Sequence, residues 1–332
     1  MRAMALYHQA PIDRRPLVRE DRPAPTPGPG EVLVGVSACG VCRTDLHLVE
    51  GDLPLVTTPI VPGHQVVGRV ERLGPGARRF AVGDRVGIAW LHWTCGACAR
   101  CRAGRENLCA ASPYTGYHAD GGFADYAVAP EAFAYAMPGG LDDVQAAPLL
   151  CAGIIGYRAL RLAAVPSGGR LGIYGFGSSA HVTLQIARAR GAEVYVCTRE
   201  PTHRELARRL GATWTGDVRE AMPRPMDGTI VFAPAGDLVP LALRGLDRGG
   251  TVALAGIHMS PIPALDYAGH LFQERALRSV TANTRADGED LLAEAARLPL
   301  HVQTTVFGLH EANEALAGLA GGTFAGSGVL RC

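Results

Sequence analysis

Four of the nine cysteines of this chain fall within fifteen consecutive residues, and no other feature of the sequence restricts the fold as strongly. The stretch reads CGACARCRAGRENLC, so the spacing is C-x2-C-x2-C-x7-C. Clustered thiols form either disulfides or a metal site, and in a reducing compartment they are more often metal ligands. Four thiolates complete the tetrahedral coordination of zinc and leave no open position. The spacing therefore predicts a closed, structural zinc site made by Cys95, Cys98, Cys101 and Cys109.

Composition and charge favour a cytoplasmic globular protein, in which thiols stay reduced. The N-terminal stretch MRAMALYHQAPIDRRP has no apolar run long enough for a signal peptide, and no segment approaches the ~20 apolar residues of a membrane span. A net charge of +1 over 332 residues, expected to form two domains, gives no reason to expect nucleic acid or a membrane as partner. The chain contains no lysine, which excludes Schiff-base catalysis and a phosphate-loop lysine.

Three further metal-type side chains are scattered over the first half of the chain. Cys42 follows the strand-like run EVLVGVSA, His64 lies in the strand-like run VPGHQVVGRV, and Cys151 lies where an apolar helix is expected to begin. Two sulfurs and one imidazole are the type of three-ligand set that leaves one zinc position open for water or substrate. Taken singly, a buried histidine is usually a core residue and a lone cysteine a small hydrophobe, so spacing alone leaves both interpretations open.

The polar residues just after Cys42 have the composition of a proton pathway. Asp45 is a candidate acceptor for the second N–H of a zinc-bound histidine, an interaction that fixes the tautomer of the ring. Thr44 and His47 form a hydroxyl–imidazole pair that is able to pass a proton toward solvent. The alternative is that both residues merely fill a loop.

The second half of the chain alternates strand-like and helix-like segments. The run RLGIYGFGSSAHVTLQIARARGAEVYVCTR reads as a strand, a glycine turn, an amphipathic helix and a second strand. Further alternation through GTIVFAPA, LVPLALRGL, GGTVALAGI and SVTAN predicts an α/β domain with a doubly wound parallel sheet. The turn fits the dinucleotide-binding pattern G-x-G-x-x-G/A, in which the backbone approaches a pyrophosphate at a helix N-terminus. Its residues are Gly175, Gly177, Ser178, Ser179 and Ala180.

In this order, the motifs resemble those of the zinc-dependent medium-chain alcohol dehydrogenases over essentially the whole chain. The matching stretches are CRTDLH, GH, the four-cysteine lobe, LLCAGI, GFGSSA and NTRADG. The resemblance implies a mainly-β, GroES-like catalytic domain interrupted by a Rossmann dinucleotide-binding domain. It assigns residues 1–148 and 287–332, with the zinc lobe at 95–109, to the catalytic domain and residues 149–286 to the Rossmann domain. It also implies a homodimer or homotetramer.

The resemblance further implies two zinc ions per chain and a role for each matching residue. Cys42, His64 and Cys151 match the ligands of the family's catalytic zinc, and the four clustered cysteines match those of its structural zinc. Thr44 and His47 match the family's proton relay.

The resemblance also implies residues for the cofactor site and the substrate pocket. Arg43 matches a residue that holds the cofactor pyrophosphate, and Gly256 and Ile257 would lie along the nicotinamide. Trp90 matches a residue that narrows the substrate pocket, and Met259 would add to an apolar wall.

Three positions depart from the family pattern near the expected site. Gln65 follows the zinc histidine where a glutamate is usual, so the metal site is less negative. Ile155 replaces a threonine that often packs on the nicotinamide, and Ser327 replaces an arginine that often contacts the pyrophosphate. These changes leave the zinc ligands intact and bear on cofactor affinity and ligand exchange.

A fourth departure concerns the end of the second Rossmann strand, where NAD-specific proteins usually place an acidic residue on the ribose. Thr198 and Arg199 occupy that position, and Arg204 follows five residues later. A hydroxyl and guanidinium groups suit a 2′-phosphate, so the sequence favours NADP(H) over NAD(H). Two features oppose this interpretation: a solvent-facing Arg199 would leave NAD accommodated passively, and Glu200 lies one residue away.

The reaction implied by the resemblance is hydride transfer between a primary alcohol or aldehyde and NAD(P)(H). Two alternatives remain at this stage. One is an NADPH-dependent reductase of activated C=C bonds, although such an enzyme has no use for the three zinc ligands. The other is a non-enzymatic zinc- and dinucleotide-binding protein.

Overall fold

The computed structural model describes all 332 residues, which form two compact units. The catalytic unit comprises Met1–Cys151, Ala282–Arg297 and His301–Cys332, and the nucleotide unit comprises Ala152–Thr281 and Leu298–Leu300. The chain therefore leaves the catalytic unit after Cys151 and returns to it at Ala282, three residues later and five residues earlier than the sequence suggested.

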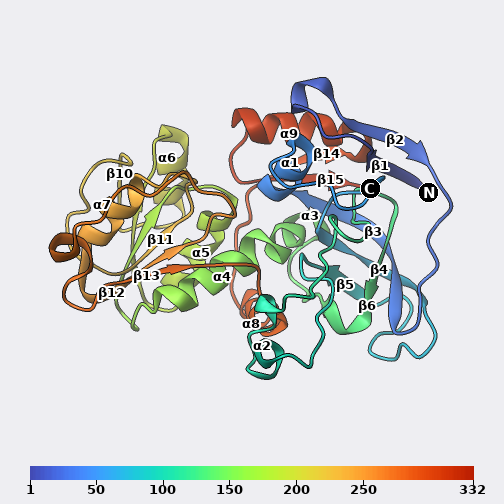
Figure 1. Ribbon diagram of the computed structural model, residues 1–332, viewed down its shortest axis with the longest axis horizontal. Helices are drawn as coiled ribbons and strands as arrows, with labels where there is room; N and C mark the ends of the chain where they lie inside the picture. Colours follow the sequence, from blue (N-terminus) through green and yellow to red (C-terminus); the bar gives the residue numbers. More distant parts are fainter. The chain divides into compact units, whose positions relative to one another are not determined.

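The catalytic unit is built on a seven-stranded sheet in the order β14-β15-β3-β4-β5-β7, with β6 paired to β3. The central strand β3 is apolar along most of its length, because it pairs on both edges and is buried on both faces. Figure 1 shows the red C-terminal strands beside the blue β3. The strands of this unit, including the separate hairpin β1-β2, are β1 (Arg2–Leu6), β2 (Leu17–Asp21), β3 (Glu31–Val41), β4 (Gln65–Leu73), β5 (Arg85–Ile88), β6 (Tyr126–Pro130), β7 (Ala134–Ala136), β14 (Thr304–Gly308) and β15 (Ser327–Arg331).

The helices of the catalytic unit are short. Helix α9 packs against β15 and α1, and its apolar side chains join the hydrophobic core of the unit. The helices of the unit are α1 (Arg43–Glu50), α2 (Ala99–Arg102), α3 (Asp143–Ala146), α8 (Arg285–Ala295) and α9 (Ala312–Gly321).

The nucleotide unit contains a six-stranded sheet in the order β10-β9-β8-β11-β12-β13, and every strand pair is parallel. Numbered from the first strand of the unit, this order is 3-2-1-4-5-6, which is the Rossmann topology and confirms the predicted fold class. The strands are β8 (Arg170–Tyr174), β9 (Glu193–Cys197), β10 (Trp214–Gly216), β11 (Met226–Val231), β12 (Leu246–Leu254) and β13 (Ala276–Ser279). The last strand lies earlier than the expected SVTAN segment, because its register is set by pairing Ala276–Ser279 with Thr251–Leu254 of β12.

Helices connect the parallel strands of this unit. Helix α4 packs along α5 and over β11 and β12, whereas α7 contributes to a second apolar cluster with Tyr174, Tyr195 and Val231. The helices are α4 (Ala152–Ala163), α5 (Ser178–Ala189), α6 (Pro201–Arg209) and α7 (Leu238–Arg244). No single helix has both the length and the apolar composition to cross a membrane; only the bent pair 143–150 and 152–163 meets those two criteria together.

Candidate metal centres and dinucleotide site

Cys42 lies at the junction between the central strand and the first helix. It follows β3 directly and acts as the N-cap of α1, with its Sγ accepting the Thr44 N–H at 3.3 Å. Its own N–H donates to Asp45 Oδ2 at 2.9 Å. The two interactions hold the backbone of Cys42 in an extended conformation and fix the direction of the thiol.

His64 is positioned by the glycine before it. Gly63 adopts φ +98°, a left-handed conformation that favours glycine, and a Cβ there would approach a Phe123 ring carbon to 2.4 Å. The turn delivers His64 to the start of β4, where the imidazole is 1 % exposed. Asp45 Oδ1 lies 3.2 Å from His64 Nδ1, so Nε2 is directed away from the carboxylate toward the cysteines.

Cys151 owes its position to a broken helix. Pro148 has no N–H to donate and interrupts the helical run after α3, so residues 147–150 form a 3₁₀ turn. The segments before and after Cys151 meet at 45°. Cys151 itself adopts a non-helical conformation, φ −134° and ψ −69°, between that turn and α4.

These three elements bring Cys42, His64 and Cys151 together, with their ligand atoms all within 4.8 Å of one another. Cys42 Sγ lies 3.2 Å from His64 Nε2. Zinc–sulfur and zinc–nitrogen bonds of ~2.3 and ~2.0–2.1 Å give a tetrahedral S···N edge of about 3.6 Å. The donor types, their number and their separation therefore fit a zinc ion with one position left for another ligand.

The charges within this set favour the form that binds metal. Burial alone would raise the pKa of the Cys42 thiol, but the hydrogen bond with Cys151 and the charge of His64 outweigh it and hold this pKa well below the usual value. The same hydrogen bond, together with burial, raises the pKa of Cys151. One thiolate is thus already favoured, and metal binding would release the Cys151 proton and the proton on His64 Nε2.

Thr44 and His47 both lie on α1, one turn apart, and Thr44 is buried. His47 Nδ1 lies 2.7 Å from Asp52 Oδ2 just beyond the end of the helix. A carboxylate facing Nδ1 holds the proton on that nitrogen and leaves Nε2 as the basic one. Asp52 was not among the residues predicted from the sequence, because its separation of five from His47 matches no helical face and its carboxylate is largely exposed.

Trp90 stands edge-on to His64, with ring centroids 4.9 Å apart and planes at 72°. Its indole also stacks on Tyr114 at 4.8 Å and lies nearly parallel to Tyr117 at 6.0 Å. These three stacked rings, here called the aromatic wall, lie beside the three-ligand set, with Trp90 in contact with His64. The two tyrosines gave no sequence signal, because only pairing of the loop around Leu91 with Tyr114 places them there.

The four-cysteine lobe forms a second compact set of sulfurs. The Sγ atoms of Cys98 and Cys101 are 3.5 Å apart, those of Cys95 and Cys109 3.6 Å, and those of Cys95 and Cys101 3.9 Å. Four Zn–S bonds of ~2.3 Å give S···S edges of about 3.8 Å. A backbone hydrogen bond involving Cys95 lowers the pKa of Cys109 to about 6, which favours the thiolate. The lobe fits a zinc ion with no open position.

Gln65 is completely buried beside the first set, but it contributes no donor to it. Its side chain fills the space over Gly40, where a Cβ would meet the Gln65 amide carbon at 2.8 Å. The amide Nε2 makes no hydrogen bond to another protein group. Gln65 therefore acts as a neutral filler next to His64.

The glycine turn lies between β8 and α5. Gly175 has φ +85°, and a Cβ there would come within 2.9 Å of the Ala233 backbone N. Gly177 caps α5, and a Cβ on it would meet nothing within 4 Å, so an anionic group can approach the backbone there. Ser178 and Ser179 form the first turn of the helix, and Ala180 is fully buried. The turn fits a dinucleotide pyrophosphate.

The end of β9 carries the residues expected to contact the ribose. Thr198 is buried and donates its N–H to Gly216 O, whereas Arg199 is exposed. Arg204 differs from the expectation: its Nη1 donates to the carbonyls of Thr198 and Arg199 at 2.7 and 2.8 Å. Arg204 therefore shapes the strand end, and Arg199 is the guanidinium that remains directed to solvent.

Four predicted positions remain, namely Arg43, Gly256, Ile257 and Met259. Arg43 begins α1, and Gly256 and Ile257 follow β12, with Ile257 54 % exposed. Met259 packs against the apolar cluster of the nucleotide unit, so its side chain is committed in part to that core.

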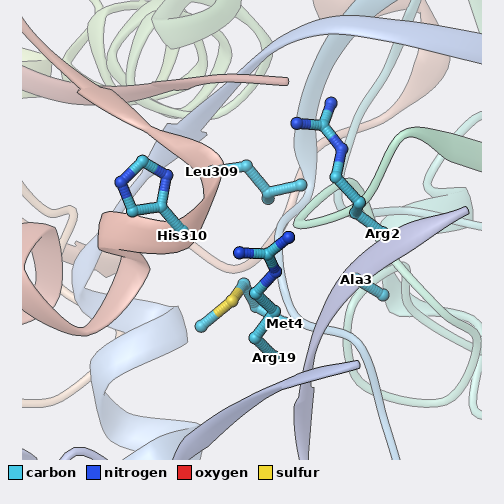
Figure 2. A pocket seen from close by; sticks show the side chains of 6 residues that line it. All are labelled: Arg2, Ala3, Met4, Arg19, Leu309 and His310. Atoms are coloured by element: carbon cyan, nitrogen blue, oxygen red, sulfur yellow. The ribbon is translucent and has the colours of Figure 1, made fainter. Parts of the chain in front are cut away.

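A surface hollow in the catalytic unit is separate from the metal sets. Figure 2 shows its lining, with the side chains of Arg2, Arg19 and His310 around Met4 and Leu309. The hollow has a volume of about 40 Å³, and the Arg2 guanidinium is already paired with Asp125 at 2.6 Å. It is too small for an alcohol together with a dinucleotide.

Comparison with known proteins agrees with this geometry. Residues 28–139 match the family model of the alcohol dehydrogenase GroES-like domain, and residues 175–297 match that of zinc-binding dehydrogenases. A probable alcohol dehydrogenase of Mycobacterium tuberculosis is 52 % identical over 99 % of this chain and 97 % of its own length.

Two solved structures add the cofactor. A putative zinc-binding dehydrogenase from Sinorhizobium meliloti bound to NADP is 30 % identical, with a TM-score of 0.87 over 100 % of this chain and 99 % of the other. An acetophenone reductase from Geotrichum candidum in complex with NAD is 26 % identical, with a TM-score of 0.89 over 100 % and 97 % of the two chains.

Proposed function

Since the chain belongs to the zinc-dependent medium-chain alcohol dehydrogenase family, it is an oxidoreductase that uses zinc and NAD(P), and we propose that Cys42, His64 and Cys151 hold its catalytic zinc. The observation that carries this assignment is the convergence of two thiols and one imidazole within 4.8 Å on three separate elements. The four-cysteine lobe holds the structural zinc. The substrates are primary alcohols and aldehydes with an apolar group, which the wall of Trp90, Tyr114 and Tyr117 favours over a sugar.

Each part of the proposed site has its own role in the reaction. When bound, the metal supplies Lewis-acid polarisation of the alcohol or carbonyl oxygen, and the dinucleotide supplies the hydride acceptor or donor. Asp45 holds the His64 ring in the tautomer that presents Nε2. The aromatic wall keeps water from that side of the set and orients the substrate. The glycine turn at the start of α5 receives the pyrophosphate.

Thr44 and His47 move the alcohol proton to solvent. Asp52 holds the His47 Nδ1 proton, so Nε2 is the nitrogen that accepts the proton delivered along the pathway. His47 is only 18 % exposed, whereas Asp52 is 59 % exposed, so the pathway ends at the protein surface.

We expect His47→Ala to reduce alcohol oxidation, with the largest loss at low pH, where hydroxide is the scarcest alternative acceptor. General acid–base groups of this kind contribute ~10²–10⁴-fold to rate. The measurement is kcat as a function of pH, with and without added imidazole as a soluble base.

Asp52→Asn is the matched variant, because it keeps the side-chain size and removes the charge that faces Nδ1. It should cause a smaller loss of the same pH dependence. A His47→Ala profile that matches the wild type at every pH would remove His47 from the reaction.

The dinucleotide preference rests on the end of β9. No carboxylate stands at Thr198 or Arg199 to repel a 2′-phosphate, and this absence carries the proposal, because the exposure of Arg199 at the strand end suits either dinucleotide. Arg204 holds the carbonyls of these two residues and so fixes the loop that presents the Arg199 guanidinium. We therefore assign NADP(H) as the preferred cofactor.

Arg199→Ala should weaken NADPH binding by about 1–3 kcal/mol, the scale of a lost hydrogen bond to a charged group, and leave NADH nearly unchanged. The dissociation constants are measurable by fluorescence of the reduced nicotinamide. Arg208→Ala is the control, because Arg208 lies on α6, the helix that follows Arg199, and pairs with Glu205. Equal losses for both cofactors, or tighter NADH binding by the wild type, would contradict the assignment.

The experiment that tests the function is a panel of primary and secondary alcohols and the matching aldehydes, assayed with NADH and NADPH and with metal content measured on the same sample. Turnover of primary alcohols by protein with two zinc ions per chain is the expected result. Absence of turnover across the panel, despite tight dinucleotide binding, would contradict it.

A further inference from the structure

Glu106 lies inside the four-cysteine lobe, between its third and fourth cysteines. It opens the 3₁₀ turn that precedes Cys109, and its carbonyl accepts the Cys109 N–H at 3.0 Å. The residue is only 9 % exposed, which is unusual for a charged side chain. Its backbone is therefore fixed by the lobe, while its carboxylate is directed elsewhere.

That carboxylate is occupied by one residue, 179 positions later in the chain. Glu106 Oε1 accepts the backbone N–H of Arg285 at 2.8 Å and its Nε–H at 3.0 Å, and Oε2 accepts an Nη2–H at 2.7 Å. The guanidinium also lies over the Phe133 ring, 4.4 Å from its centroid. A bidentate, charge-assisted pair that also satisfies a backbone N–H is among the strongest polar contacts a protein makes.

Arg285 is the first residue of α8, and α8 begins just after the chain has returned to the catalytic unit at Ala282. Ala282 adopts φ +45°, a left-handed conformation that costs a residue with a side chain about 1–3 kcal/mol unless its surroundings hold it. Asn283 is held by the Tyr135 hydroxyl, and Thr284 by a capping box with Asp287. Residues 283–285 are thus each held by hydrogen bonds within the catalytic unit.

The chain passes to the nucleotide unit after Cys151, returns at Ala282, and passes over again for residues 298–300; the first two of these crossings each adjoin a proposed zinc site. The outgoing crossing follows Cys151, a ligand of the catalytic set, and the returning crossing is tied through Arg285 to the lobe. We propose that the four-cysteine lobe, when it holds zinc, clamps the returning crossing through Glu106 and so orders residues 280–287. The lobe then has a role beyond the stability of its own loop.

The geometry explains why the metal matters for this clamp. The lobe has few hydrophobic side chains, and its order depends on the metal bonds among its four cysteines. Without the metal, the turn that holds Glu106 would lose the fixed position of Cys109, and the carboxylate would no longer be presented to Arg285.

The test is hydrogen exchange of the zinc-loaded protein, followed by mass spectrometry of peptides that span residues 279–288. Glu106→Gln keeps the shape of the side chain and removes its charge. Because a charge-assisted hydrogen bond is about twice as strong as a neutral one, we expect exchange in this segment to rise about tenfold. Zinc content, measured on the same sample, should stay at two per chain.

Glu289→Gln is the matched control. Glu289 lies one turn later on the same helix and pairs with Arg79 at 3.3 Å; it acts on Arg285 only through its charge, and its carboxylate is exposed and outside the lobe. Exchange in residues 279–288 should match the wild type in this variant. Unchanged exchange in Glu106→Gln, or an equal rise in both variants, would overturn the clamp.

A double-variant comparison separates a clamp from general loosening. Cys98→Ser should raise exchange in residues 279–288 in the wild-type background, because the lobe loses its metal. In the Arg285→Gln background it should add little, because the connection is already cut. Additive increases in exchange would overturn the proposal. If Cys98→Ser does not fold, the same comparison is made with Glu106→Gln and Arg285→Gln.

Discussion

Cys42→Ser is expected to abolish alcohol oxidation and to leave a folded protein with one zinc ion per chain. A serine hydroxyl is not ionised at neutral pH and binds zinc poorly, so the set would fall from three ligands to two. Lewis-acid catalysis by a metal contributes several kcal/mol to transition-state stabilisation, so the expected loss in kcat is about a thousandfold or more. Steady-state kinetics and metal analysis of one preparation measure both effects.

Cys39→Ala is the matched control for this variant. Cys39 lies three residues earlier, near the end of β3, which directly precedes Cys42; it is buried, but it is not part of the ligand set. This variant should keep two zinc ions and most of the turnover. A Cys42→Ser protein that still bound two zinc ions, or still turned over, would refute the assignment of Cys42 as a ligand.

Cys98→Ser should act on stability rather than on chemistry. A structural zinc site contributes ~10–16 kcal/mol to the folding of isolated peptides. In a larger folded unit, other interactions keep part of that stability when the zinc is lost. We expect a loss of at least about 5 kcal/mol, equivalent to a fall in Tm of about 10–20 °C for a unit of this size. The thermal unfolding midpoint measures it, and Cys42→Ser, with Tm near the wild type, serves as the comparison.

The difference between the two proposed zinc sites can also be tested without mutation. A chelator should strip the open three-ligand site first, because a vacant coordination position gives it access, and the closed lobe should keep its ion. Activity should therefore fall in parallel with the loss of the first zinc equivalent, while Tm stays nearly constant. Release of both ions at the same rate would contradict the distinction between open and closed sites.

Short sequence patterns were sufficient to predict the sites whose residues lie close together in the sequence. The glycine turn after β8 was predictable because both the turn and the helix that it starts lie within a few residues of each other. The cysteine lobe was predictable for the same reason, since four ligands within fifteen residues carry their own geometry. Cys42, His64 and Cys151 were selected by motif order, because no spacing rule connects residues that only the sheet brings together.

What the sequence did not predict depends on long-range placement. Tyr114 and Tyr117 reach the site because a bridge joins Tyr114 to Leu91, and Glu106 meets Arg285 across most of the chain. Arg204 was expected to contact a phosphate, but the fold of the strand end directs it to two backbone carbonyls. In each case tertiary packing determines the partner, and a short stretch of sequence carries no information about it.

The pairing of β3 with β15 also sets the order in which this chain can fold during synthesis. Gly328–Arg331 complete the sheet beside Ala38–Val41, so this part of the β3 edge, beyond the part that β6 covers, stays open until residues 328–331 have been synthesised. The nucleotide unit is almost continuous in sequence and needs none of those residues, so it can fold while the first unit is still waiting. Closure over so long a loop is slow, and an open, apolar strand edge is a template for aggregation in the meantime. Pairing of residues 328–331 with β3 therefore completes the sheet of the catalytic unit late in synthesis and removes this open edge.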